Sequence, residues 1–82
     1  MSNGLINLQF RNSRIRGKIE HLRKNANNSV QREIDRIASE QPLAALDDSA
    51  EALEQVHDNL RRRAEALVRA GVAKLKDFQD LL

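Results

Sequence analysis

The sequence has no cysteine, tryptophan or tyrosine, and only one proline, three glycines and two phenylalanines among its 82 residues. Without cysteine, the chain forms neither a disulfide scaffold nor a thiolate metal site. No apolar run approaches the roughly 20 residues that cross a bilayer, and no basic stretch followed by an apolar one marks a signal peptide. These absences predict a cytoplasmic protein that does not enter a membrane.

The scarcity of aromatic side chains also predicts a small core. A 9.3 kDa chain with two phenylalanines buries little apolar surface to offset the entropy of ordering its backbone. We therefore expect a homo-oligomer, either a dimer or a tetramer, because association with further copies stabilises a chain that is only marginally stable alone.

Catalytic chemistry has no visible basis in the sequence. No nucleophile stands beside a base, no glycine-rich loop is suited to phosphate, and no carboxylate pair lies in an apolar setting. His21 and His57 are isolated, without a second histidine or a carboxylate at the spacing of metal ligands. We therefore expect no enzymatic activity, no cofactor and no metal ion.

Charge is distributed unevenly along the chain. Residues 1–41 carry eight Arg or Lys against four acids, whereas residues 42–82 carry six against eight. A basic first half joined to an acidic second half is typical of a chain that binds a polyanion at one end and a protein at the other. We divide it into a DNA-binding and dimerisation domain at 1–41, a linker at 42–47 and a helical tail at 48–82.

Residues 5–11 alternate apolar and polar side chains. This period of two predicts a short strand with Ile6, Leu8 and Phe10 on one face. Asn12 and Ser13 follow, and side chains of these types cap helix N-termini. The fold class predicted is therefore mainly α with one short N-terminal strand.

Helical spacing of apolar residues runs from about Arg14 to Ser39. Three asparagines between positions 25 and 28 weaken a helix and favour a break, after which Ser29 is suited to cap a second helix. One unbroken helix is the alternative, because the spacing of three and four residues continues through Ala26.

The tail is predicted to be one long oligomerisation helix. Pro42 ends the preceding helix, and Asp48 with Glu51 forms a capping box, so the helix runs from about 49 to 81. Its imperfect heptads predict an oligomerisation seam, made of Leu53, His57, Leu60, Ala64, Leu67, Gly71 and Phe78. The three consecutive arginines at 61–63 are interpreted as a solvated surface or as part of interchain ion pairs, since Asp58 and Glu65 can pair with some of them.

A strand of about seven residues needs a partner, and the simplest partner is the same strand of a second copy. Such a two-stranded ribbon fits the major groove of double-stranded DNA, and its polar face would present Asn7, Gln9 and Arg11 to base edges. The helix that begins after Ser29 would offer free backbone amides to a phosphate. Arg14 and Lys24 are the side chains expected to add phosphate contacts.

Two segments resemble the ribbon-helix-helix repressors of the Arc and Mnt type. Ile6-Asn7-Leu8-Gln9-Phe10 looks like the strand of that family, and Ser29-Val30-Gln31-Arg32-Glu33-Ile34 looks like the start of its second helix. The resemblance covers residues 5–40 and implies an intertwined dimer that binds an operator and represses transcription. It also implies that the amides of Ser29 and Val30 contact the DNA backbone, and that the tail joins dimers into a tetramer.

Two other functions remain open. In the first, helix 14–40 folds back on helix 49–81 as an all-helical hairpin that acts as a chaperone, adaptor or inhibitor. In the second, the front half binds DNA and the tail binds a protein partner, as in antitoxins that repress their own operon. Asn7 and Gln9 are also open to a simpler interpretation, as the solvated face of an edge strand.

Overall fold

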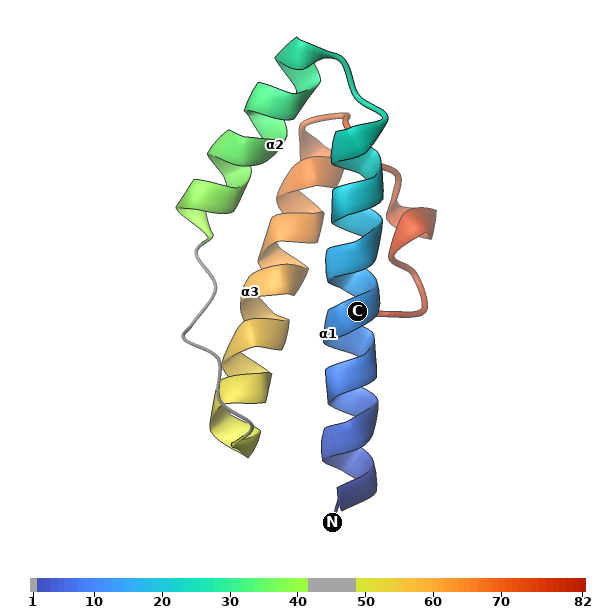
Figure 1. Ribbon diagram of the computed structural model, residues 1–82, viewed down its shortest axis with the longest axis vertical. Coiled ribbons are helices and arrows are strands. Elements are labelled where there is room, and N and C mark those ends of the chain that lie inside the picture. The colour runs from blue at the N-terminus through green and yellow to red at the C-terminus, as the bar shows by residue number, and fades with distance from the viewer. Residues whose placement is uncertain (1, 42–48) are drawn as a thin grey trace.

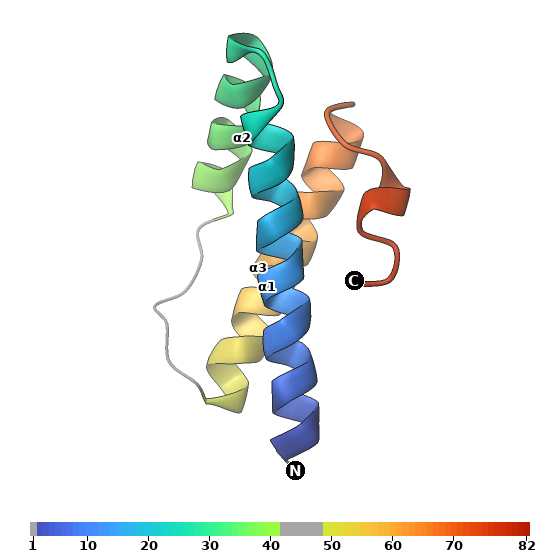
Figure 2. The ribbon, with the colours of Figure 1, turned by 45° about the vertical axis from the view of Figure 1, so that its right-hand side comes forward.

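The computed structural model describes residues 2–41 and 49–82, with side chains from Gly4 onward. It contains three α-helices and one 3-10 helix: α1 (Ser2–Lys24), α2 (Asn28–Glu40), α3 (Ala50–Arg69) and η1 (Leu75–Asp77). Helix α2 runs antiparallel to α1, and α3 runs beside α1 in the same direction (Figure 1). Residues 70–82, here called the C-terminal segment, turn back beside α1 (Figure 2).

The predicted mainly α character is confirmed, but the predicted N-terminal strand is wrong. Throughout the described ranges the chain is helical or irregular and has no strand, and residues 5–11 lie within α1. As helix, their apolar positions join a stripe that continues in steps of three and four residues, through Leu5, Leu8, Asn12, Ile15, Ile19 and Leu22. A helix satisfies its own backbone groups, whereas a lone strand leaves them unpaired. The cost is that Ile6 and Phe10 remain exposed.

The break between the first two helices is confirmed, although its cap is not the one predicted. Asn27 is the N-cap of α2, and its side-chain Oδ1 accepts a hydrogen bond from the Val30 amide at 3.0 Å. Ser29 therefore lies inside the first turn of α2. Within the described ranges no residue other than glycine has a positive φ, so the chain turns here without a left-handed asparagine.

Helix α3 begins where predicted and ends earlier. Ser49 caps it by accepting a hydrogen bond from the Ala52 amide at 3.2 Å, while Asp48 of the predicted capping box lies outside the described residues, as do Pro42 and the linker. The helix stops at Arg69, because Gly71 adopts φ +78° and the Val72 amide donates back to the Leu67 carbonyl at 3.1 Å. This is a Schellman C-cap, which glycine fills without strain.

The core is built from all three helices and from the C-terminal segment. Its buried members are Ile15, Ile19, Ile34, Ile37, Val56, Leu60, Ala64, Leu67, Phe78 and Leu81. Because the chain reverses after Gly71, Phe78 packs in this core instead of extending the line of Leu53, Leu60 and Leu67. The residues predicted to form a seam between chains are therefore largely covered by the chain itself. No described helix is both long enough and apolar enough to span a bilayer.

Candidate nucleic-acid interface

The three residues predicted to read bases all lie on α1, where helical geometry separates them. Asn7 and Arg11 are four residues apart and share one side of the helix, whereas Gln9 lies on another side. Arg14 and Lys18 continue the first side in steps of three and four residues. We call Asn7, Arg11, Arg14 and Lys18 the cationic stripe, and all four are exposed.

The positive charge of the chain is concentrated on α1. This helix carries six Lys or Arg against one Glu, and Arg11, Arg14 and Lys18 make no ion pair with any described residue. On α3, by contrast, Arg61 and Arg62 both pair with Asp58, at 2.8 and 3.1 Å. The expected pairing of these two arginines with Asp58 is thus confirmed, whereas the three cations of the stripe have no ion pair.

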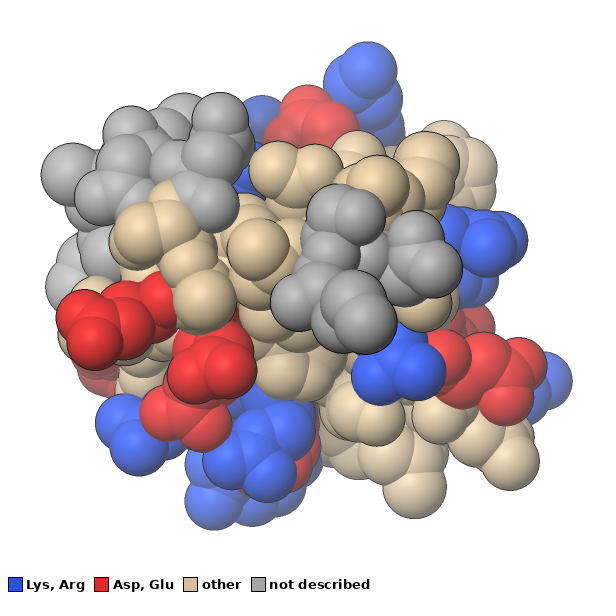
Figure 3. Space-filling view, turned by 90° about the horizontal axis from the view of Figure 1, so that it is seen from below, with Lys and Arg blue, Asp and Glu red and all other residues tan. Residues whose placement is uncertain are grey.

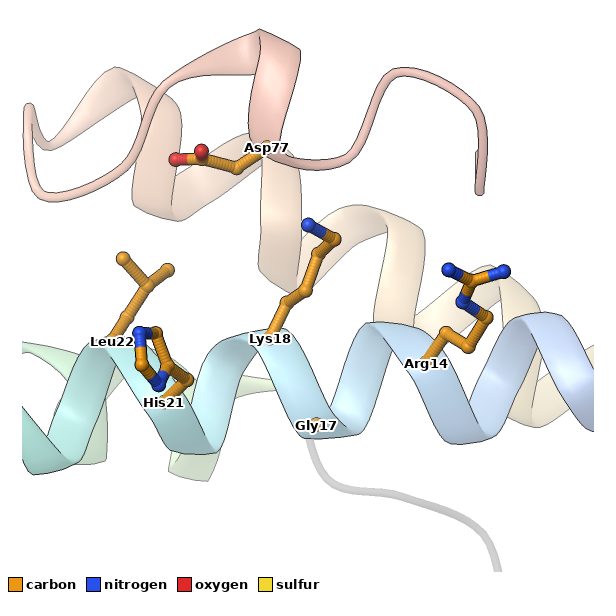
Figure 4. A pocket seen from close by; sticks show the side chains of 6 residues that line it. All are labelled: Arg14, Gly17, Lys18, His21, Leu22 and Asp77. Carbon is orange, nitrogen blue, oxygen red and sulfur yellow. The ribbon is translucent and has the colours of Figure 1, made fainter.

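A cleft of about 370 Å³ separates the upper end of the stripe from the C-terminal segment. Figure 4 shows Lys18 extending from α1 toward this segment, with Arg14 to one side and Asp77 above. The Asp77 carboxylate is held in place by the Lys74 amide, which donates to it at 3.0 Å. A second hollow of about 220 Å³ continues beside Arg14 and Lys18 as far as Asp80. The C-terminal segment therefore places acids beside Arg14 and Lys18.

The lower end of the stripe is open. The C-terminal segment ends beside the middle of α1, so the N-terminal half of the helix projects beyond it in both ribbon views (Figures 1 and 2). Asn7 and Arg11 belong to this projecting half.

Comparisons of the chain with protein families, curated proteins and solved structures find no match. The chemistry of this surface therefore has to be judged from its own residues.

The predicted phosphate contacts are not brought together. Arg14 lies on the stripe, while the start of α2, with Ser29 and Val30, lies at the opposite end of α1 from Asn7 (Figure 1). The Val30 amide is already engaged by the side chain of Asn27. Lys24 is exposed at the C-terminal end of α1. Arg14 therefore shares one surface with Asn7 and Arg11, whereas the start of α2 lies apart from that surface.

Two residues that were predicted to lie in the oligomerisation seam, Gly71 and His57, have other structural roles. Gly71 is the left-handed residue that follows the C-cap Ala70 and ends α3, and the His57 side chain contacts Asn12 between α3 and α1. The Asn12 side chain is 4% exposed, donates to the Leu53 carbonyl at 3.2 Å, and lies 3.1 Å through its Oδ1 from His57 Nδ1. Burial lowers the pKa of His57, and the charges of Arg11 and Arg61 lower it further. A neutral imidazole with its proton on Nδ1 fits this contact.

Arg63 has a role that the sequence did not reveal. Its Nη2 donates to the carbonyls of Gln41 and Ala38, at 2.6 and 3.3 Å, and thereby satisfies free carbonyls at the C-terminal end of α2. Burial lowers the pKa of Arg63, and the nearby charge of Arg16 acts in the same direction. Among the described residues no three His, Asp or Glu side chains are grouped to hold a metal ion.

Proposed function

We propose that the protein binds double-stranded DNA through the cationic stripe of α1 and represses transcription by occupying the bound site. The observation that carries this proposal is the location of the charge. Helix α1 contains six Lys or Arg and one Glu in a chain of net charge +2, and three of these cations, Arg11, Arg14 and Lys18, share one side without an ion pair. Uncompensated cations on one surface are the footprint of a polyanion site, because each neutralised phosphate releases counterions.

The side chains of the stripe suit this partner. An α-helix fits the major groove, where arginine pairs with guanine and asparagine pairs with adenine. Asn7 and Arg11, in the projecting half of α1, are the groups proposed to meet base edges. Arg14 and Lys18 lie higher on the same side and are proposed to contact phosphates. The stripe covers 11 residue steps, or about 16 Å, which spans a groove about 12 Å wide.

The first test is selection of random duplex DNA by the purified protein at about 0.15 M salt, a concentration at which nonspecific binding is weak. We expect enrichment of a short motif by the wild-type protein and loss of enrichment by the variant Arg11→Ala/Arg14→Ala. The matched control is Arg61→Ala/Arg62→Ala, which removes the same charge from α3 and should enrich the wild-type motif.

The result that contradicts the proposal is equally clear. If no motif is enriched, or if both double variants lose binding to the same extent, the stripe is not a DNA-reading surface. The all-helical interaction protein would then be the better account, and Ile6 and Phe10, exposed on α1, would be the first residues to examine for a protein partner.

A further inference from the structure

Helix α1 has a second apolar side that the described part of the chain does not cover. Ile6 and Phe10 are 46% and 64% exposed, and with Gln9 and Ser13 they line a shallow hollow of about 270 Å³. Ser13 and Gly17 continue the same side, in steps of three and four residues. We call Ile6, Phe10, Ser13 and Gly17 the outer stripe. Figure 3 views the molecule from the end where α1 begins, and on that face most of the Lys, Arg, Asp and Glu side chains lie toward the rim.

We infer that the outer stripe binds the outer stripe of a second copy of this chain, with the two α1 helices antiparallel. When the two-fold axis passes between Arg11 and Asn12, Phe10 of each copy faces Ser13 of the other. Ile6 likewise faces Gly17. Every layer of the contact then sets a large side chain against a small one, which is the condition for close packing of two helices.

Charge favours the same arrangement. In the antiparallel pair, Arg14 of one copy lies level with Gln9 of the other, and Arg11 lies level with Asn12, so each of these cations is level with a neutral amide. A parallel pair would instead place Arg14 beside Arg14 and Phe10 beside Phe10, and it would leave a void between the two glycines. The next positions in the same spacing, Glu20 and Lys24, are charged and limit the contact to four layers.

The proposed contact is small beside a typical specific interface, which covers about 800 Å² per partner. Because four layers make a small contact, we expect a dissociation constant on the order of 10 µM. This inference does not depend on DNA binding, but the two-fold axis would bring both cationic stripes onto one face.

Sedimentation equilibrium of the full chain without DNA is the direct test. We expect a mass of twice 9.3 kDa at high concentration, and a monomer at the same concentration for Phe10→Gln. Leu75→Gln is the matched control, because Leu75 is also exposed, at 61%, but lies outside the outer stripe. Unfolding midpoints measured at concentrations where the wild type is monomeric should be unchanged, since both side chains contribute little to the core. A monomer up to about 0.5 mM, or dissociation by Leu75→Gln instead of Phe10→Gln, overturns the inference.

A substitution at Gly17 tests association separately from folding. A Cβ atom placed there meets no atom within 4 Å, so Gly17→Leu fits the monomer but fills the space that Ile6 of the other copy requires. We expect this variant to be monomeric and at least as resistant to urea as the wild type. A dimer of wild-type affinity in Gly17→Leu would overturn the inference.

Single cysteines determine the direction, because the chain contains none of its own. In the antiparallel pair the two Ser13 positions are about 4.5 Å apart along the helices, and the two Ile6 positions about 16 Å apart. Ser13→Cys should therefore form a disulfide-linked dimer under oxidation, and Ile6→Cys should not. Efficient linkage through Ile6→Cys would indicate a parallel pair and overturn the antiparallel arrangement.

Discussion

Helix α2 depends on the side chain that caps its first turn. Asn27 Oδ1 accepts from the Val30 amide, which has no carbonyl partner inside the helix. We expect Asn27→Ala to lower the free energy of unfolding by about 1 kcal/mol, as loss of an N-cap usually does. Ser29→Ala, two residues later and exposed, should change it by less than about 0.5 kcal/mol. Urea unfolding followed by circular dichroism measures both, and a larger effect at Ser29 would contradict this cap.

His57 should make the stability depend on pH. Its pKa lies below the ordinary value of 6.5, because the imidazole is partly buried and lies near Arg11 and Arg61. As the pH falls below about 6.5, the unfolded chain binds a proton more readily than the folded one, so folding becomes less favourable. Above that range both states are neutral and the effect vanishes.

Unfolding free energies between pH 7 and 5, compared for wild type and His57→Gln, measure this contribution. We expect the wild type to lose more stability toward acid than the variant does. His21→Gln, on the exposed outer side of α1, is the control and should follow the wild type. If His57→Gln has the same pH dependence as the wild type, the imidazole is not the group responsible.

Asn7 and Gln9 should differ in their effects on DNA sequence preference. A ribbon would present both side chains to the same groove, whereas α1 places only Asn7 on the cationic stripe. We expect Asn7→Ala to relax specificity at one position of the bound site, with a cost of about 1–3 kcal/mol for the preferred base. Gln9→Ala should leave the preference unchanged. Competition binding with single-base variants of the selected site measures this, and an equal effect of both changes would contradict the assignment of base contacts to the cationic stripe.

At the scale of elements, replacing either of two glycines by alanine should change the free energy of unfolding, but in opposite directions. Gly71 has φ +78° and closes α3, so Gly71→Ala forces alanine into a left-handed conformation and should cost about 1 kcal/mol. Gly17 lies inside α1 with open space around it, so Gly17→Ala should raise the free energy of unfolding by about 0.4–1 kcal/mol. Denaturant unfolding of both variants at concentrations that favour the monomer tests the pair, and destabilisation of similar size at both positions would contradict it.

Local signals in the sequence were sufficient for the helix breaks. The asparagine run and the capping-box pattern of Asp48 and Glu51 predicted where α2 and α3 begin to within a few residues, because capping depends on neighbouring side chains alone. The end of α3 also had a local signal, Gly71 after Arg69, but apolar spacing continues as far as Phe78 and favoured a longer helix. Only the folded chain distinguishes a helix that continues from a segment that returns to the same core.

Residues 5–11 were predicted wrongly for a similar reason. Over seven residues a period of two and a helical stripe both fit, so the choice depends on whether backbone groups find partners elsewhere. The same error concealed the candidate site. Arg11 and Arg14 were each predicted to contact DNA, but their alignment with Asn7 and Lys18 exists only when these residues form a helix. The partnership of Asn12 with His57 joins two distant helices and has no signal in the sequence.

At the scale of the whole molecule, DNA affinity should depend steeply on salt. Each phosphate neutralised by a Lys or Arg adds about 0.9 to the slope of log affinity against log salt. Arg14→Ala/Lys18→Ala should therefore weaken binding on all sequences and reduce the slope by about 2. Fluorescence anisotropy of a labelled duplex between about 50 and 200 mM salt measures it. An unchanged slope would show that neither cation contacts phosphate.

Phe10 is 64% exposed and Phe78 is 0% exposed, so the two phenylalanines can report separately on the surface of α1 and on the core. With no tryptophan or tyrosine in the sequence, ultraviolet fluorescence is of little use. Fluorinated phenylalanine, however, would give two ¹⁹F resonances. The Phe78 resonance would respond to unfolding of the core, and the Phe10 resonance to whatever covers the outer side of α1. A single titration, followed by both signals, would thus distinguish a partner that docks on the surface from a condition that opens the fold.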